Sequence, residues 1–448
     1  MSSRDKVQAR RLKGFQDYHP PIMEMRYKIM DIIRDEAAKA GFKAVGTPAL
    51  EYSEVLLGVG GETDKQVFRF QDNGDRDVAL RFDLTVPFAR YVAEHQGSLN
   101  FPFKRLQIGD VWRAEKPQKG RYREFCQCDL DIVGVNSIEA DMEILLCFRN
   151  ILSRIDMGPF TMAIGHRLIL SALISKTLGI QDPELESKAL IIIDKLDKIG
   201  KDKVLGQLDE IAKEKPGGGE ILIEAIADKD PETGTHLSKI AKLLEGDSEN
   251  LEVLEQLRST VETINHVSKT SKGKVIIDLS IARGLGYYTG ICFETTIDSL
   301  PGFGSICSGG RYNELVERYL NRQLPGIGGS IGLDRLLAGL QELEKIEQAL
   351  DEQTVFVAIA SDKARTKAFE ILQDLRNQNI KADIALKTNK LANQFKHANR
   401  QGYPVVVTLG DDEIAKQTVS VKDMRSGEEK KGVPQTQLVD TLKGIIKM

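Results

Sequence analysis

The sequence is poor in the residues and patterns that mark secreted and membrane proteins. Its 448 residues include only five cysteines, an odd number, and one tryptophan. So few cysteines do not form a disulfide framework, and we therefore expect a reducing, cytoplasmic environment. No apolar run approaches the roughly 18 residues that a membrane-spanning helix needs, and the basic N-terminus lacks the apolar stretch of a secretory signal. These absences exclude a transmembrane protein.

Several familiar catalytic motifs are also missing. The sequence has no Gly-x4-Gly-Lys-Ser/Thr loop and no Gly-x-Ser-x-Gly elbow, which removes the main support for a Walker-type NTPase or a serine hydrolase. In the glycine-rich run 326–332 the last glycine comes one residue too late for a dinucleotide fingerprint. Cys126-x-Cys128 lacks the second ligand pair of a structural zinc site, so we predict two buried strand residues there and no metal.

The charges are nearly balanced, with 62 Lys and Arg against 66 Asp and Glu, a net charge of −4. The protein therefore does not bind nucleic acid through overall charge. The segment 354–448, however, has 16 basic and 11 acidic residues and so carries +5, which leaves −9 on the rest of the chain. This asymmetry predicts an end domain that contacts a polyanion.

The hydrophobic pattern divides the chain into four segments. Residues 1–169 and 272–350 mix strands and helices, and they flank a Lys/Glu/Leu-rich segment, 170–271, with apolar residues at helical spacing. In residues 354–448 strands alternate with helices, as in a small α/β domain with parallel strands. We therefore expect a core in two parts, a helical insertion and a separate C-terminal domain.

Two regions of the first segment carry most of the polar residues of interest. We expect a strand over Val78–Thr85 and a helix from Pro87 to about His95, since proline favours a first helical turn. Two further strands, Phe103–Glu115 and Tyr122–Val133, are joined by a charged turn at 116–121 and predict a long antiparallel hairpin with a basic tip.

Strand alternation places the polar residues of this hairpin on one face. Arg113 and Glu115 share a face of its first strand. One face of the second strand has Arg123, Phe125, Gln127, Asp129 and Asp131, and the other has Cys126, Cys128, Leu130 and Ile132, which point into the core. The polar face is either a solvated surface or the floor of a ligand site. The basic residues of the tip, Lys119, Arg121 and Arg123, favour a floor that binds phosphates.

Three other segments supply candidate ligand groups. Asp83 and Thr85 fall on one face of their predicted strand, where a carboxylate and a hydroxyl suit an ammonium group, although a plain polar strand face fits equally well. In the segment 282–290 glycines surround Arg283, Tyr287 and Tyr288, so that an arginine is available for a phosphate and hydroxyls for a polar substrate. A strand over 326–332 leads into a helix with Arg335 in its first turn.

Taken in order, these segments resemble the motifs of class II aminoacyl-tRNA synthetases, and most closely the histidyl-tRNA synthetase family. The resemblance covers nearly the whole chain and rests on Lys13-Gly-Phe-x-Asp17, Val111-Trp-Arg113 through Arg121-Tyr-Arg-Glu-Phe125, Ala282-Arg-Gly-Leu-Gly-Tyr-Tyr-Thr-Gly290, Ser308-Gly-Gly-Arg-Tyr312 and Gly332-Leu-Asp-Arg335. It implies an α+β catalytic domain on an antiparallel sheet with a helical insertion, and a C-terminal α/β domain of the anticodon-binding type.

The resemblance also implies an activity and a set of partners. These are ATP with Mg²⁺, L-histidine, tRNA(His) and a second copy of the chain in a homodimer. The histidine carboxylate would attack the α-phosphorus of ATP and release pyrophosphate, and the histidyl group would then pass to the 3′ end of the tRNA. Because the attacking carboxylate is already ionised, the reaction needs positioning and stabilisation of phosphate charge but no general base.

Residue by residue, the resemblance assigns roles to the candidates above. Arg113 and Arg283 would contact the α-phosphate as the catalytic residues, Arg121 and Arg335 would bind the rest of the triphosphate, and Glu115 would lie near the nucleotide. Asp83, Thr85 and Gln127 would bind the amino and carboxylate end of histidine, and Asp131, Tyr287 and Tyr288 would surround the imidazole.

The sequence departs from the family pattern at Gly286, where the motif usually has Asp, and has Asp83 and Asp131 where some members have Glu. A regulatory paralogue that kept the fold and lost the reaction is one alternative, which Gly286 favours and the four arginines oppose. A synthetase for another amino acid, such as proline or threonine, is a second alternative, which Arg283 and the paired tyrosines oppose. A purely structural protein is disfavoured by the polar strand faces.

Overall fold

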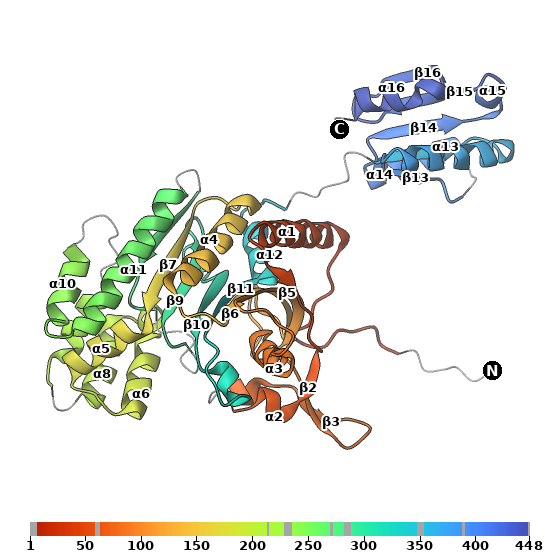
Figure 1. The fold of residues 1–448 in the computed structure, drawn as a ribbon. Coiled ribbons are helices and arrows are strands. Elements are labelled where there is room, and N and C mark those ends of the chain that lie inside the picture. Colours follow the sequence, from red (N-terminus) through yellow and green to blue (C-terminus); the bar gives the residue numbers. More distant parts are fainter. Residues whose placement is uncertain are drawn as a thin grey trace. The chain divides into compact units, whose positions relative to one another are not determined.

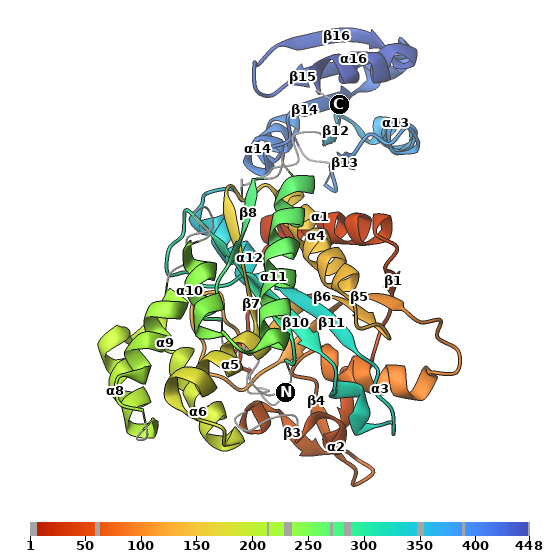
Figure 2. The ribbon, with the colours of Figure 1, turned by 60° about the vertical axis from the view of Figure 1, so that its left-hand side comes forward.

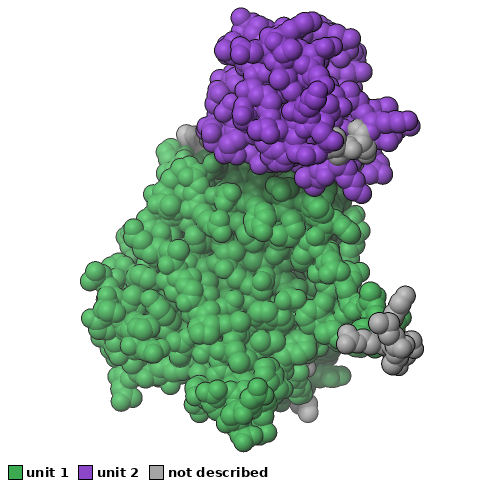
Figure 3. Space-filling model, turned by 90° about the vertical axis from the view of Figure 1, so that its right-hand side faces the viewer, with its two compact units in different colours: residues 1–346 green, residues 347–448 purple. Residues whose placement is uncertain are grey.

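The computed structural model describes residues 7–58, 63–212, 215–227, 235–268, 272–281, 288–346, 354–387 and 390–446. The chain divides into two compact units, Met1–Ile346 and Glu347–Met448 (Figure 3). Among the described residues no helix is both long and apolar enough to cross a membrane.

A mixed sheet of eight described strands forms the centre of the first unit (Figure 1). Its middle strands are antiparallel, whereas the outermost strands β1 and β8 run parallel to their neighbours. In spatial order the strands are β1 (Lys43–Ala44), β5 (Phe103–Trp112), β6 (Glu124–Val133), β11 (Gly326–Gly332), β10 (Cys307–Tyr312), β9 (Ile291–Ile297), β7 (Phe160–His166) and β8 (Gly273–Ile277).

Helices cover one face of this sheet and bury its apolar side (Figure 1). They are α1 (Pro20–Lys39), α4 (Ile138–Ile155), α11 (Ser248–Val267) and α12 (Leu333–Glu342). Ile29 and Ile33 of α1 and Phe148 of α4 belong to the same buried cluster as Leu130 and Ile132 of β6. The predicted apolar face of this strand is therefore confirmed, and its other face is left for polar residues.

The predicted hairpin is present, but both of its strands are shorter than expected. β5 pairs with β6 in antiparallel register from Phe103–Val133 to Trp112–Glu124. Arg113 and Glu115 therefore lie beyond the end of β5 rather than within it, although the Arg113 N–H still donates to the Arg123 carbonyl at 2.8 Å. Charged and turn-forming residues crowd the tip and end the regular pairing early.

The expected strand over Val78–Thr85 is wrong in its second half. β4 (Asp77–Leu80) is the middle strand of a small sheet with β2 (Leu50–Tyr52) and β3 (Arg69–Gln71), and helix α3 (Thr85–His95) begins at Thr85. The Val86 N–H donates to the Asp83 carboxylate at 3.0 Å, so Asp83 satisfies an N–H of the first helical turn. Thr85 is thus the first residue of a helix and does not share a strand face with Asp83.

Most of the segment that the sequence predicts as helical lies beside β7 (Figures 1 and 2), whereas α11 near its end packs against β8 and α4 of the central layer. Its apolar residues at helical spacing pack into the same core as the sheet. The helices of this group are α5 (Arg167–Leu178), α6 (Pro183–Ile193), α7 (Leu196–Ile199), α8 (Lys201–Ile211), α9 (Gly218–Ala227) and α10 (Thr235–Leu243), and the first unit also contains the short helices α2 (Ser53–Leu56), η1 (Thr63–Gln66) and η2 (Leu315–Arg318).

The second unit has its own sheet, in the order β13-β12-β14-β15-β16. The first three of these strands are parallel, as the alternation of strands and helices predicts, and β15 and β16 extend the sheet in antiparallel fashion. The elements are β12 (Val355–Ile359), η3 (Asp362–Ala364), α13 (Arg365–Asn377), β13 (Ala382–Ile384), α14 (Leu391–Gln401), β14 (Val405–Leu409), α15 (Asp411–Ala415), β15 (Thr418–Asp423), β16 (Glu429–Pro434), η4 (Gln435–Gln437) and α16 (Leu438–Ile445).

Candidate active site

Two adjoining cavities lie over the polar face of the central sheet. The first has a volume of about 200 Å³ and the second about 260 Å³. They share a wall made of Arg113, Gln127, Ser308 and Ser330. Two ligands bound in these cavities would therefore meet at this wall, where Arg113 is the charged residue.

Strand β6 supplies the floor of the site by simple alternation. Cys126 and Cys128 are buried in the core beneath the sheet, as predicted, and Gln127 points into both cavities. Asp129 and Asp131 are each only 1% exposed, so this face is not a solvated surface. A buried polar face with cavities above it favours the ligand floor over the alternative of a plain outer face.

The first cavity collects small polar groups from several elements. It is lined by Asp83 and Thr85 from the start of α3, by Gln127 from β6 and by Tyr288, which the sequence predicts to share one binding site. Burial raises the pKa of Asp83. The Gln127 amide donates to the Ser330 hydroxyl at 3.0 Å, and its buried oxygen has no hydrogen-bond partner among the described residues. This oxygen is an acceptor available to a ligand.

The second cavity is lined by guanidinium groups. Arg113, Arg121 and Arg335 line it together with Glu115 and the ring of Phe125. Arg113 is oriented by a 2.9 Å hydrogen bond from its Nε to the Phe82 carbonyl and by the Phe125 ring, whose centroid is 5.1 Å from its Cζ. Three planar cations around one cavity suit the oxygens of a polyphosphate.

Asp334 also lines the second cavity, but its charge is already paired. Its carboxylate accepts hydrogen bonds from the Arg26 Nη1 at 2.5 Å and the Cys126 N–H at 2.7 Å, and from the Tyr18 hydroxyl. As the sequence predicts, β11 leads into α12 with Arg335 in its first turn, and Asp334 anchors that turn to α1 and β6. Asp334 thus holds Arg335 in place and does not neutralise the arginines of the cavity.

Asp131 is not among the described residues that line either cavity. It lies behind the first cavity, where its carboxylate contacts Arg105 and accepts a 2.5 Å hydrogen bond from the Tyr312 hydroxyl. Burial raises the pKa of Asp131 and, together with the neighbouring charge of Asp131, raises that of Asp129 to about 7 against the opposing effect of Arg105. Tyr312 itself lines the cavity, so its side chain connects Asp131 to the cavity wall.

Several residues that line the first cavity have no role predicted from the sequence, among them Glu294, Ser308, Tyr312 and Ser330. Glu294 is the single charged residue of β9, a strand otherwise made of apolar residues and threonine, and that isolation is a usable signal. Ser308 and Tyr312 fall in a segment already noted for its resemblance to the family. The position of Tyr312 depends on strand pairing, which a single sequence does not reveal.

Two predicted site residues, Arg283 and Tyr287, lie outside the described residues, as does Gly286. Their expected roles stay predictions. The described residues contain no group of three or more His, Cys, Asp and Glu side chains that would hold a metal ion.

Comparison with known proteins gives two family matches that together cover most of the chain. The family model described as histidyl-tRNA synthetase matches residues 14–336, and the anticodon binding domain matches residues 354–445.

Individual relatives agree with these matches over almost their full lengths. The histidine–tRNA ligase of Rhodopirellula baltica is 40% identical over 94% of this chain and 95% of its own, and that of Wolinella succinogenes is 38% identical over 95% and 96%. The crystal structure of histidyl-tRNA synthetase from Nostoc sp. PCC 7120 superposes with a TM-score of 0.85 at 30% identity, over 98% of this chain and 100% of that one. A Bacillus halodurans structure titled as an ATP phosphoribosyltransferase regulatory subunit/histidyl-tRNA synthetase shares the fold at 23% identity and a TM-score of 0.73, over 90% of this chain and 99% of that one.

Proposed function

Since the chain belongs to the histidyl-tRNA synthetase family, we propose that its first cavity binds histidine and its second binds ATP. The enzyme is a class II aminoacyl-tRNA synthetase, a histidine–tRNA ligase. It activates histidine with ATP to give histidyl-adenylate and pyrophosphate, and it transfers the histidyl group to tRNA. Its C-terminal anticodon-binding domain carries the net charge of +5 that suits a polyanion.

The observation that carries the division of the site is the position of Arg113. Arg113 belongs to the wall between the two cavities, where the histidine carboxylate and the α-phosphate would meet. As the carboxylate attacks phosphorus, the bond to pyrophosphate breaks, and negative charge gathers on the phosphate oxygens. A guanidinium already fixed at this point stabilises that charge without reorganisation, and no side chain has to remove a proton.

In the second cavity we assign Arg121 and Arg335 to the β- and γ-phosphates, and Glu115 to the nucleotide. We propose that Arg283 joins Arg113 at the α-phosphate. Mg²⁺ would enter the site bound to the phosphate oxygens of ATP. Glu115 lines this cavity and would be the carboxylate available to bind the ion.

In the first cavity we assign Asp83, Thr85 and the free oxygen of Gln127 to the polar end of histidine. A buried carboxylate beside a hydroxyl and an amide oxygen suits an ammonium group. Tyr288 and Tyr287 would surround the imidazole. Asp131 would contribute to the imidazole end indirectly, through its hydrogen bond with the Tyr312 hydroxyl.

We further propose the domain division that the sequence predicts. Residues 1–169 and 272–350 would form the catalytic core, which 170–271 interrupts as a helical insertion, and 354–448 would bind the anticodon of tRNA(His). The described cavity residues come from 83–127 and 281–335, on both sides of the insertion, which supports this division. A homodimer and a cytoplasmic location remain proposals based on the family.

The deciding experiment is amino-acid-dependent ATP–pyrophosphate exchange, run with each standard amino acid, followed by charging of tRNA(His). We expect exchange with histidine alone. Replacing Arg113 with Lys should lower the exchange rate by roughly 10²- to 10³-fold, because the guanidinium hydrogen bonds that stabilise charge on the reacting phosphate are lost. The matched control is Arg123→Lys, because Arg123 lies on the same hairpin tip, bonds the Glu115 carbonyl at 3.1 Å and is not among the described residues lining either cavity. A complete lack of exchange in the wild type would instead indicate a regulatory paralogue.

A further inference from the structure

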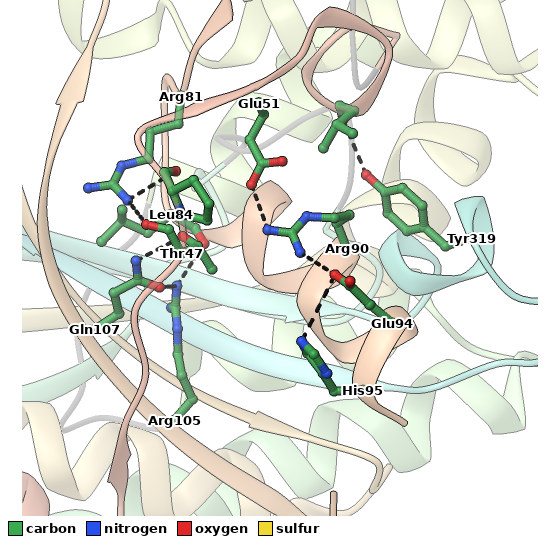
Figure 4. Close-up of polar contacts among 12 residues, drawn as sticks. Thr47, Glu51, Arg81, Leu84, Arg90, Glu94, His95, Arg105, Gln107 and Tyr319 are labelled. Carbon is green, nitrogen blue, oxygen red and sulfur yellow. Dashed lines mark hydrogen bonds and ion pairs between the residues drawn. The ribbon is translucent and has the colours of Figure 1, made fainter. Parts of the chain in front are cut away.

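A fully buried arginine lies directly behind the first cavity. Arg105, on β5, is 0% exposed and contacts Asp131 through Nη1. Its Nη2 donates to the Leu84 carbonyl at 2.6 Å and to the Gln107 side-chain oxygen at 2.9 Å (Figure 4). Arg105 is not among the described residues that line the cavity, so any effect on a ligand must pass through these partners.

Asp131 connects this arginine to a hydroxyl on the cavity wall. One carboxylate oxygen of Asp131 contacts Arg105, and the other accepts the Tyr312 hydroxyl at 2.5 Å. A tyrosine hydroxyl has one proton to donate. Because Tyr312 gives that proton to Asp131, the oxygen that it presents to the cavity is an acceptor.

The charge and shape of Arg105 keep this arrangement in one orientation. A guanidinium has donors only, so Asp131 must turn an acceptor oxygen toward it. Burial raises the pKa of Asp131, while the positive charge of Arg105 and the hydrogen bond from Tyr312 oppose that rise. Asp129, 3.6 Å from the same guanidinium, is a second carboxylate that depends on it.

We propose that Arg105 is a positioning residue which, through Asp131, fixes the Tyr312 hydroxyl as the acceptor for the ring N–H of the bound amino acid. This specificity role rests on the proposed function of the first cavity. A ring without an N–H leaves the buried hydroxyl oxygen unpaired, and such loss of a partner is what allows a polar site to reject a close analogue. The contact of Arg105 with the Leu84 carbonyl ties the same arginine to the segment that carries Asp83 and Thr85.

The test compares histidine with thiazol-4-ylalanine, in which sulfur replaces the ring N–H and leaves a similar five-membered ring. The measurement is kcat/KM for each amino acid in ATP–pyrophosphate exchange. Tyr312→Phe should lower the ratio of histidine to thiazolylalanine by roughly 10- to 100-fold and leave the KM for ATP unchanged. Arg105→Met should lower the ratio as far, and Arg105→Lys, which keeps the charge but loses the planar fork, should give an intermediate ratio.

Tyr319→Phe is the matched control. Its hydroxyl donates to the Val55 carbonyl at 3.2 Å (Figure 4), and Tyr319 is not among the described residues that line either cavity, so this variant should keep the wild-type ratio. Thermal unfolding establishes that the Tyr312→Phe and Arg105→Lys variants are folded. A folded Arg105→Lys variant that keeps the wild-type ratio would overturn the role of Arg105. Tyr288 and Glu294 are the rival polar groups of this cavity.

The proposal is overturned if folded Tyr312→Phe keeps the wild-type ratio of histidine to thiazolylalanine. It is also overturned if this ratio falls only in Tyr288→Phe or in Glu294→Gln. In either case the wild type would still show histidine-dependent exchange, so the proposed function would stand. Failure of the proposed function is a different outcome, since the wild type would then show no histidine-dependent exchange at all.

Discussion

At the scale of single residues, buried carboxylates define the chemistry of this site. Asp129 pairs in strand register with Ser330, a residue of the wall that the two cavities share, and lies next to Asp131 and Arg105. Two buried carboxylates face a single guanidinium there, so one negative charge is left without a full partner. Burial therefore raises the pKa of Asp129 to about 7.

This shift predicts a pH dependence of stability. Asp129 has an ordinary pKa of 3.8 when the chain is unfolded and about 7 in the folded protein, so the folded state binds the proton more tightly between these values. Its contribution to the free energy of unfolding is thus fully present below about pH 4 and lost as the pH rises through 7. Asp129→Asn cannot titrate, so the stability of the wild type relative to this variant should fall between pH 4.5 and 7.5, by on the order of a few kcal/mol.

Urea unfolding of both proteins at several pH values measures this difference. Asp298→Asn, which changes an exposed carboxylate, serves as the control and should show no such trend. A gap between the wild type and Asp129→Asn that stays constant with pH would contradict the assignment.

At the scale of elements, the glycines of β11 explain how the buried carboxylates fit into a central strand pair. A Cβ at Gly328 would lie 2.0 Å from the Asp131 Oδ1 and 2.7 Å from the Leu130 carbonyl. Backbone atoms cannot give way as a flexible side chain does, so only glycine allows β11 to approach β6 this closely. The glycine-rich run, which fails as a dinucleotide fingerprint, therefore serves to make room for a polar floor.

Gly328→Ala should accordingly displace Asp131 or the strand beside it. We expect a KM for histidine raised by about tenfold or more and a loss of about 1–3 kcal/mol in stability from overpacking. Kinetics of pyrophosphate exchange and thermal unfolding measure the two effects. Gly206→Ala in α8, where an added Cβ meets nothing within 4 Å, should leave the KM unchanged and stabilise the helix slightly. Normal histidine binding by Gly328→Ala would show that Asp131 does not need its present position.

The elements also show how far a single sequence leads. Alternation in β6 predicts which side chains are buried beneath the sheet and which form the floor, because successive residues of a strand point to opposite faces. The start of α3 is missed because Asp83 and Thr85 look like a strand pair until the capping bond from the Val86 N–H is known. Asp131 contacts Tyr312, which is 181 positions away in the sequence, and Arg105, which is 26 positions away. Local sequence patterns carry no information on such contacts.

At the scale of the whole molecule, the two compact units have separate cores. The buried clusters of residues 355–446 contain no residue of the first unit, and the clusters around the large sheet contain none of the second. All described residues that line the two cavities belong to the first unit. Amino-acid activation and recognition of the tRNA are thus assigned to parts of the chain with independent packing.

A chain that ends at Ile346 should therefore keep histidine-dependent pyrophosphate exchange within about tenfold of the full chain, because its core and cavities are intact. It should lose charging of tRNA(His), since the anticodon-binding domain and its basic surplus are absent. Exchange and charging assays on the same preparation separate the two activities. A folded fragment without exchange would show that the second unit is required for the first chemical step.

The anchoring of Asp334 has a practical consequence for handling the protein. Two of its three hydrogen-bond donors, Tyr18 and Arg26, come from the first tenth of the chain, more than 300 positions away. Proteolytic clipping after Arg26 would leave an almost buried carboxylate facing the arginines of the ATP cavity, where it would compete with the triphosphate for them. A preparation nicked near its beginning should thus lose nucleotide affinity while every residue that lines the cavity is still present.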